Sequence, residues 1–292
     1  MRAVRSGRGR RADGAEARPG GSVIRIGHFE FLNGYPLYYG LEKGKGWGCF
    51  ELVRGVPTVL NRLLLAGRLD ISPVSSIEYA AHPRRLLLFP TISITADGAV
   101  DSIRLISTRP IDAVGSVALT GQSATSVVLL RILLGQQYGL SPAYSALSGG
   151  VGDAFESGCD AVLLIGDQAL EACYRGRWPY SYDLGKLWKE FTGLPMVFAL
   201  WAVRRSFFEA RPDETLEVQD RLIHSLQYCH GHWEEVVAAA AREYEFTPAL
   251  LRAYFAKLGY DLNGDCRRGL TEFFRRAAAI RAVGQVPQLE FV

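Results

Sequence analysis

The chain of 292 residues lacks any apolar stretch long enough to cross a bilayer, and no apolar run before Ile24 could form the core of a secretory signal. The glycine-rich nucleotide motifs G-x-G-x-x-G and G-x-x-x-x-G-K-[ST] are also missing, as is the G-x-S-x-G of serine hydrolases. Their absence removes the usual sequence support for nucleotide binding and serine-hydrolase chemistry. We expect no membrane partner.

Cysteine and histidine patterns give no support for a disulfide framework or a metal site. The five cysteines are odd in number and scattered, without C-x-x-C spacing: Cys49, Cys159, Cys173, Cys229 and Cys266. Three histidines share one polar stretch without the i, i+4 pair of a helical metal site: His224, His230 and His232. We therefore expect free thiols, no metal, no cofactor and a reducing, cytoplasmic compartment.

Positive charge is concentrated in the first 22 residues, which contain six arginines against Asp13 and Glu16. Because the whole chain has 33 basic and 30 acidic residues, the remainder has 27 basic and 28 acidic ones. A near-neutral body has no basic face for nucleic acid, so no nucleic-acid partner is expected. The Gly- and Ala-rich leader, 1–22, is predicted to be disordered rather than a nucleic-acid or membrane arm.

Apolar periodicity predicts an α/β protein with two lobes, because 292 residues with 48% apolar content suffice for two cores. Strands are predicted at 23–27, 50–54, 69–73, 115–119, 160–165 and 195–203, with helices between them and a helical C-terminal region. Pro57 and Gly67 mark the two ends of one helix. Such alternation favours a mostly parallel sheet. We assign lobe 1 to 23–108 plus 199–292 and lobe 2 to 109–198, with hinges near 103–109 and 197–203.

Ligands of open α/β sheets bind beyond the carboxyl ends of strands, where loops meet helix N-termini. The turn at 121–126 fits this rule best, because its hydroxyls and backbone N–H groups can hold an anion: Gly121, Ser123, Thr125 and Ser126. The same residues suit ordinary helix capping, and the sequence leaves both interpretations open.

Five further polar residues lie near predicted strand ends: His28, Asn33, Ser75, Ser76 and Asp167. Ser75, Ser76 and Asp167 could contact a ligand or cap a helix. Asn33 also suits a simple turn. His28 could be a general acid or base, or a structural hydrogen-bonding residue.

Several strings in this order resemble the chorismate dehydratase family of the futalosine route to menaquinone. They are IGHFEFLNGYPL at 26–37, GRLDISPVSSIEY at 67–79, DGAVDS at 97–102, LIGD at 164–167 and WKEFTGLP at 188–195. The resemblance spans about residues 23–285 and implies a hinged periplasmic-binding-protein-like fold, type II, used as a lyase. It implies that Asn33 and Ser102 act in the substrate cleft, and that Ser123, Thr125 and Ser126 hold an anion. Ala124 departs from the family, where Arg can occur.

The implied reaction removes water from chorismate to give 3-[(1-carboxyvinyl)oxy]benzoate without a metal or organic cofactor. Since the matched loops offer no clear base apart from His28, we hypothesise that the substrate's enolpyruvyl carboxylate takes the proton. One alternative is dihydroxynaphthoate synthase of the same pathway, but its S-P-C-P-N-D-T-type first loop is Phe31-Leu32-Asn33 here. A second is a non-catalytic binding protein for a small carboxylate.

Overall fold

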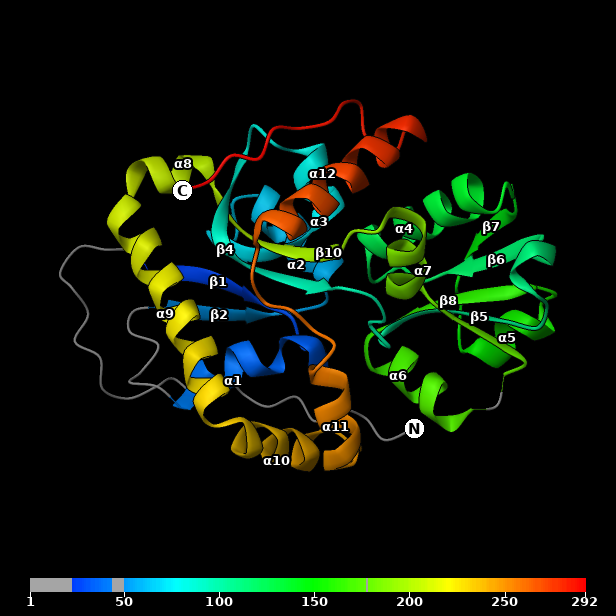
Figure 1. Ribbon diagram of the computed structural model, residues 1–292. Coiled ribbons are helices and arrows are strands. Elements are labelled where there is room, and N and C mark those ends of the chain that lie inside the picture. Colours follow the sequence, from blue (N-terminus) through cyan, green and yellow to red (C-terminus); the bar gives the residue numbers. More distant parts are fainter. Residues whose placement is uncertain (1–22, 44–49, 177) are drawn as a thin grey trace.

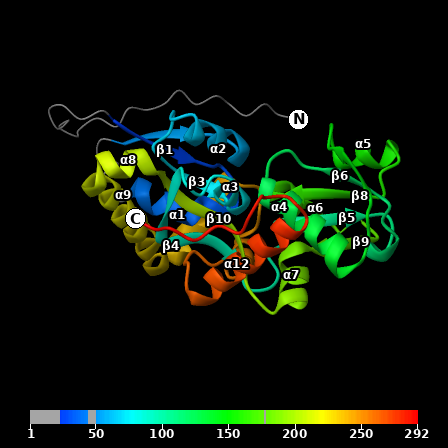
Figure 2. The ribbon, with the colours of Figure 1, turned by 90° about the horizontal axis from the view of Figure 1, so that it is seen from above.

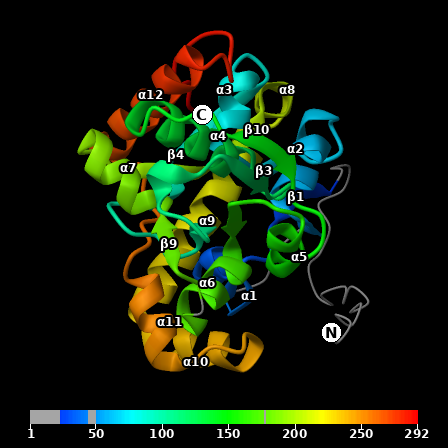
Figure 3. The same cartoon turned by 90° about the vertical axis from the view of Figure 1, so that its right-hand side faces the viewer.

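The computed structural model describes residues 23–43, 50–176 and 178–292, which form two five-stranded sheets (Figure 1). The leader predicted at 1–22 and Cys49 lie outside these residues. Figures 1 and 2 show the two sheets side by side, joined by segments of chain that cross between them. Figure 3 views the molecule from the side of the second sheet, where α5, α6 and α7 surround its strands.

The first sheet has the strand order β2-β1-β3-β10-β4. Its strands are β1 (Ile24–His28), β2 (Phe50–Arg54), β3 (Ile71–Ser75), β4 (Leu86–Ala96) and β10 (Met196–Arg204). Strand β1 pairs in parallel with β2 and β3, whereas β10 runs antiparallel to both β3 and β4. The chain therefore leaves this sheet after β4 and returns to its centre through β10.

The second sheet has the strand order β7-β6-β8-β5-β9. Its strands are β5 (Ile103–Ser107), β6 (Ser116–Leu119), β7 (Ala143–Ala146), β8 (Ala161–Ile165) and β9 (Tyr180–Asp183). Strand β6 is parallel to β7 and β8, and β5 is antiparallel to β8 and β9. Four of the five strands in each sheet run in the same direction, as the prediction of a mostly parallel sheet requires. The strands that link the two sheets, β5 and β10, run against both of their neighbours.

Helices pack around both sheets. Those following strands of the first sheet are η1 (Leu32–Gly34), α1 (Tyr35–Lys43), α2 (Pro57–Leu65), α3 (Ser76–Ala81), α8 (Arg205–Ala210), α9 (Pro212–Gly231), α10 (Trp233–Glu243), α11 (Pro248–Phe255) and α12 (Gly264–Ala279). Those among the strands of the second sheet are η2 (Ile111–Ala113), α4 (Ala124–Ile132), the π-helical η3 (Leu133–Gln137), α5 (Val151–Glu156), α6 (Gly166–Arg175) and α7 (Leu184–Thr192). As predicted, α2 begins at Pro57, and Gly67 follows it with a φ of 72°.

The segments predicted as hinges are strands in the structure. Strand β5 occupies most of 103–109 and belongs to the second sheet, and β10 covers 197–203 in the first. The chain crosses between the sheets at 97–102 and again between β9 and β10, where α7 lies. We propose that the lobe boundaries fall at these crossings, a few residues away from the positions expected from the sequence.

Helix α12 packs against both sides of the crossing. Phe273 of α12 meets Trp188 of α7 edge-on, with ring centroids 6.1 Å apart, and both side chains are fully buried. The guanidinium of Arg276 lies over the ring of Phe191, 4.0 Å from its centroid. Trp188 also donates a 3.3 Å hydrogen bond to the carbonyl of Pro195. Because large aromatic side chains bury 150–250 Å² each, these contacts hold α7 firmly against the C-terminal helices.

Candidate functional site

Three segments that are distant in the sequence meet where the chain crosses between the sheets. They are η1 after β1, the loop at 97–102, and the stretch from Tyr254 to Tyr260. Tyr260 donates a 2.9 Å hydrogen bond to the carbonyl of Asn33, and Lys257 forms an ion pair with Asp101. Leu32 and Tyr254 pack in one apolar cluster with Leu170 of α6.

Each of these segments contributes a buried polar atom that has no hydrogen-bond partner among the described residues. The three atoms are Asn33 Oδ1, Ser102 Oγ and the Tyr254 hydroxyl oxygen. Unpartnered polar atoms are rare in protein interiors, since each loses its hydration without compensation. Three of them around one crossing make this the candidate ligand site.

Asn33 is held by its backbone, which leaves its side-chain oxygen available. The N–H of Gly34 bonds the carbonyl of Phe31 at 3.0 Å and closes the turn. A Cβ at Gly34 would come within 2.5 Å of the Phe29 ring, so only glycine fits there. The turn therefore fixes the position of Asn33 without using its side chain.

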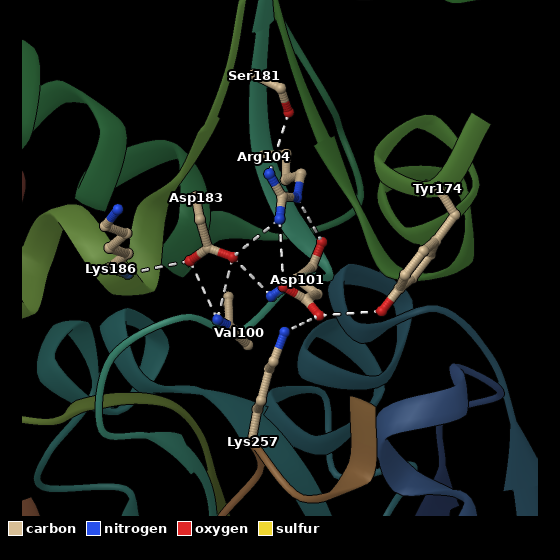
Figure 4. Close-up of polar contacts among 8 residues, drawn as sticks. All are labelled: Val100, Asp101, Arg104, Tyr174, Ser181, Asp183, Lys186 and Lys257. Carbon is tan, nitrogen blue, oxygen red and sulfur yellow. Dashed lines mark hydrogen bonds and ion pairs between the residues drawn. The ribbon is translucent and has the colours of Figure 1, made fainter. Parts of the chain in front are cut away.

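Ser102 is placed by a loop that Asp183 holds from the second sheet (Figure 4). The Asp183 carboxylate accepts bonds from the N–H groups of Val100 at 3.1 Å, Asp101 at 2.6 Å and Lys186 at 3.0 Å. The Ser102 carbonyl in turn accepts a 2.7 Å bond from the N–H of Gly166. The backbone on both sides of Ser102 is thus anchored. The residue is buried, with 1% of its surface exposed.

Asp101, next to Ser102, carries a second set of contacts. Its carboxylate pairs with Arg104 at 3.2 Å and with Lys257, and accepts a 3.2 Å bond from the Tyr174 hydroxyl (Figure 4). The residue has a φ of 56°, an uncommon value for a side chain other than glycine. A buried carboxylate with two cationic partners and a hydroxyl donor has the compensation that its burial requires. These contacts join the loop to β5, to α6 and to the segment that follows α11.

The two lobes also touch directly beside Asn33. The N–H of Leu32 donates to Oδ1 of Asp167 at 3.3 Å, and burial raises the pKa of Asp167. Phe31 lies over Gly166, where φ is 59° and a Cβ would come within 2.8 Å of its ring. Asp167 therefore contacts the other lobe rather than capping α6, whose N-cap residue is Ile165.

The hydroxyl turn before α4 performs the capping that the sequence left open. Ser123 is the N-cap residue and accepts a 3.3 Å bond from the N–H of Ser126, whose hydroxyl lies 2.9 Å from its own. Thr125 Oγ1 accepts a 3.2 Å bond from the N–H of Ile77, so it caps α3 from across the lobes. Gly121 is exposed. Capping is thus present, and anion binding by this turn stays a prediction.

Ser75 and Ser76 are buried at the start of α3. The Ser76 hydroxyl donates a 2.7 Å bond to the carbonyl of Val197 on β10. The Ser75 hydroxyl accepts from the Asn61 amide at 3.4 Å, and the Asn61 oxygen accepts from the Ser75 N–H at the same distance. Both serines therefore already have protein partners, and their expected contact with substrate also stays a prediction.

His28 is the last residue of β1. Its ring contacts that of Tyr38, with centroids 3.8 Å apart and planes tilted by 31°, and its Nδ1 is buried without a partner in the described part of the chain. Burial, assisted by the charge of Arg54, lowers the pKa of His28 to about 3. The residue lines a pocket of about 160 Å³ with Tyr35 and Tyr39, to which Asn33 and Ser102 do not contribute.

The described ranges contain neither a cluster of metal-ligating side chains nor a helix that could span a membrane. No three His, Cys, Asp or Glu side chains come together there as metal ligands. None of the helices in those ranges combines the length and apolar character needed to span a bilayer. Cys159, Cys173, Cys229 and Cys266 are free thiols.

The arrangement offers neutral hydrogen-bonding groups whose polar atoms are buried. Asn33 can donate or accept, Ser102 can do both, and burial raises the pKa of Tyr254 so that its hydroxyl keeps its proton. Fixed neutral donors of this kind stabilise a carboxylate or a developing oxyanion without reorganising during the reaction. Sequence analysis identified Asn33 and Ser102 but missed Tyr254, which lies about 150 residues further along the chain.

Two α/β lobes with a binding site at their crossing define the periplasmic-binding-protein-like class. A structure from Archaeoglobus fulgidus matches with a TM-score of 0.71 and 18% identity, over 89% of this chain and 98% of that one. The periplasmic aliphatic sulphonate binding protein of Escherichia coli matches with a TM-score of 0.62 and 17% identity, over 91% and 94%. The predicted fold class is confirmed.

Sequence comparison gives the family. The family model described as menaquinone biosynthesis matches residues 24–279. The chorismate dehydratase of Thermus thermophilus is 38% identical over 240 residues, which cover 77% of this chain and 85% of that protein. The chain belongs to this menaquinone biosynthesis family, as the resemblance predicted.

Proposed function

We propose that this protein is a chorismate dehydratase, a lyase that converts chorismate into 3-[(1-carboxyvinyl)oxy]benzoate and water for menaquinone biosynthesis. The observation that carries the proposal is the pair of buried, unpartnered side-chain atoms, Asn33 Oδ1 and Ser102 Oγ, at the lobe crossing of a member of this family. The 38% identity to a chorismate dehydratase supports the same substrate. A cytoplasmic location stays a prediction.

The chemistry asks little of the protein beyond orientation and charge placement. Elimination removes the proton at ring carbon C3 and the hydroxyl at C4, and the C–H electron pair becomes the new ring double bond. The product ring is aromatic, which provides the driving force. Asn33 and Ser102 would hold the substrate in the geometry that aligns these two bonds, a contribution of the positioning type.

The proton acceptor in this proposal is the enolpyruvyl carboxylate of chorismate itself. It takes the C3 proton, hydroxide leaves C4, and the transferred proton completes the water molecule. His28 is the alternative protein base, but its low pKa makes it a weak base at neutral pH, and it lines a pocket to which Asn33 does not contribute. Both facts favour the substrate carboxylate.

Incubating the purified protein with chorismate tests the function directly. We expect loss of one water from the substrate and appearance of the aromatic product, followed by mass spectrometry and ultraviolet absorbance. Binding of chorismate without conversion would favour instead a non-catalytic carboxylate-binding protein, a role that the fold also permits. A second assay with His28→Ala tests the base: a loss of about 10²–10⁴-fold, the contribution of a general base, or a larger loss would contradict the substrate-as-base step.

A further inference from the structure

Tyr254 of α11 is a buried tyrosine whose hydroxyl serves no visible structural purpose. Its side chain is 0% exposed, and its hydroxyl oxygen has no hydrogen-bond partner within the described residues. Its ring packs with Leu32, next to Asn33, and with Leu170 of α6 in the second lobe. A phenylalanine would make the same ring contacts without burying an unpartnered hydroxyl, which costs free energy.

The surroundings of this hydroxyl are those of the candidate site. Ser102 is near enough to the Tyr254 hydroxyl to lower its pKa, although neither oxygen has a partner at hydrogen-bond geometry among the described residues. The negative charges of Asp167, in α6, and of Asp101, in the 97–102 loop, raise the pKa of the Tyr254 hydroxyl. The hydroxyl therefore lies beside Ser102 at the lobe crossing.

The residues that follow Tyr254 fix it in this place. Lys257 pairs with Asp101, the neighbour of Ser102, and Tyr260 bonds the carbonyl of Asn33 at 2.9 Å. One short stretch, 254–260, thus touches both segments that carry the other two unpartnered atoms. A shift of α11 would disturb the position of all three groups together.

We propose that Tyr254 is a substrate-binding residue that donates its hydroxyl hydrogen bond to an anionic carboxylate oxygen of the substrate, beside Ser102. This proposal rests on the proposed function for the identity of the substrate. The chemistry fits, because a phenol that keeps its proton in a buried site donates to an anion without exchanging charge with it. Nothing in the sequence motifs around 254 assigns it this role.

The substitution Tyr254→Phe separates binding from packing. It removes only the oxygen, so the melting temperature of the ligand-free variant should equal or exceed that of the native protein. We expect kcat/KM for chorismate to fall about 10- to 100-fold, because a hydrogen bond to a charged group is lost. The rise in melting temperature caused by saturating 3-[(1-carboxyvinyl)oxy]benzoate should shrink in parallel.

Tyr79→Phe is the matched control. Tyr79 is equally buried, but its hydroxyl donates to the carbonyl of Gln288 at 2.8 Å and accepts from the N–H of Glu290 at 2.9 Å. Its loss should lower the melting temperature and leave kcat/KM unchanged. Native kcat/KM together with a native product-induced shift in Tyr254→Phe would overturn the proposal.

The test remains decisive if the native protein does not convert chorismate. That result would contradict the proposed function, and calorimetric titration with the same benzoate product would then decide on Tyr254. Weaker binding by Tyr254→Phe than by the native protein and Tyr79→Phe would support the binding role. Equal binding by all three proteins, or no binding by the native protein, would overturn it.

Discussion

Asp101 and Ser102 are neighbours in the chain, yet their side chains are in opposite situations. The Asp101 carboxylate has Arg104, Lys257 and Tyr174 as partners, whereas the buried Ser102 hydroxyl has none in the described chain. Burial is the same for both, at 3% and 1% exposure. The comparison teaches that burial alone does not mark a functional residue. In this loop the partnered Asp101 carboxylate holds the structure together, and we infer that the unpartnered Ser102 hydroxyl is available to a ligand.

The largest effect on stability should follow from removing the Asp183 carboxylate, which accepts hydrogen bonds from three backbone N–H groups. Asp183→Ala leaves the N–H groups of Val100, Asp101 and Lys186 without their acceptor. We expect the free energy of unfolding to fall by about 3–5 kcal/mol, as when a buried charged partner is removed. Urea denaturation followed by circular dichroism measures it. Asp183→Asn keeps one acceptor oxygen, so its free energy of unfolding should fall by less than that of Asp183→Ala. An equal fall in both variants would contradict this account.

Ser102→Ala should have the reverse profile. Among the residues that the structure describes, the hydroxyl has no partner to lose, so the melting temperature should be maintained. In contrast, kcat for chorismate should fall about 10²–10³-fold, the range for a preorganised donor. Steady-state kinetics and a thermal melt on the same preparation give both values. Ser145→Ala, on an exposed strand, is the control for the substitution itself. Unchanged turnover in Ser102→Ala would break the comparison.

His28 sharpens the comparison, because its Nδ1 is unpartnered but lies outside the candidate site. Its pKa of about 3 in the folded protein is below the value of about 6.5 in the unfolded chain, so the unfolded state takes up the proton first as pH falls. Its stabilising contribution is complete above about pH 6.5 and is lost toward pH 3. At pH 5 the expected loss is about 2 kcal/mol, from the shift and 1.36 kcal/mol per pKa unit.

Denaturation curves of His28→Gln between pH 4 and pH 7 check this contribution. The variant should lose less stability than the native protein as the pH falls, and it should convert chorismate at a similar rate. The same substitution at the exposed His224 controls for the loss of a histidine. An identical pH dependence in His28→Gln and the native protein would refute the assignment.

The smallest effect is expected at Ser123, a satisfied residue close to the site. Ser123→Ala removes the N-cap of α4 and should cost about 1 kcal/mol of stability. If capping is its whole role, KM for chorismate stays at the native value. A KM increase of tenfold or more would show instead that this turn holds the substrate, as the family resemblance implies.

Sequence patterns predicted helices and strands well where the apolar periodicity agreed with the proline and glycine residues that mark the ends of an element. The strand at 50–54 and the Pro57 start of α2 match the structure. Strand β4 was missed, because Pro90 interrupts its apolar run; the structure accommodates the proline in an edge strand with irregular register. The hinge positions stay a prediction. The sequence does not show that these segments are sheet strands, because an apolar run does not reveal which sheet a strand joins, and for β5 that depends on β8 and β9.

The candidate site was only partly predictable for a similar reason. Asn33 and Ser102 lie in recognisable motifs, and the family resemblance of these motifs is what predicts a role for them. The partner of the Ser76 hydroxyl is a carbonyl 121 residues away, which no local pattern reveals. Tyr254 lies in an amphipathic stretch that predicts only a helix, and its position beside Ser102 arises from the docking of α11. Tertiary contacts decide which buried polar groups are satisfied.

Measuring melting temperature and kcat/KM for Ser102→Ala and Asp183→Ala side by side tests the central claim most directly. The account predicts that Ser102→Ala melts like the native protein and loses about 10²–10³-fold in turnover. It also predicts that Asp183→Ala melts at a clearly lower temperature. A Ser102→Ala variant that melts early and retains native turnover would contradict the claim that unpartnered buried groups form the substrate site.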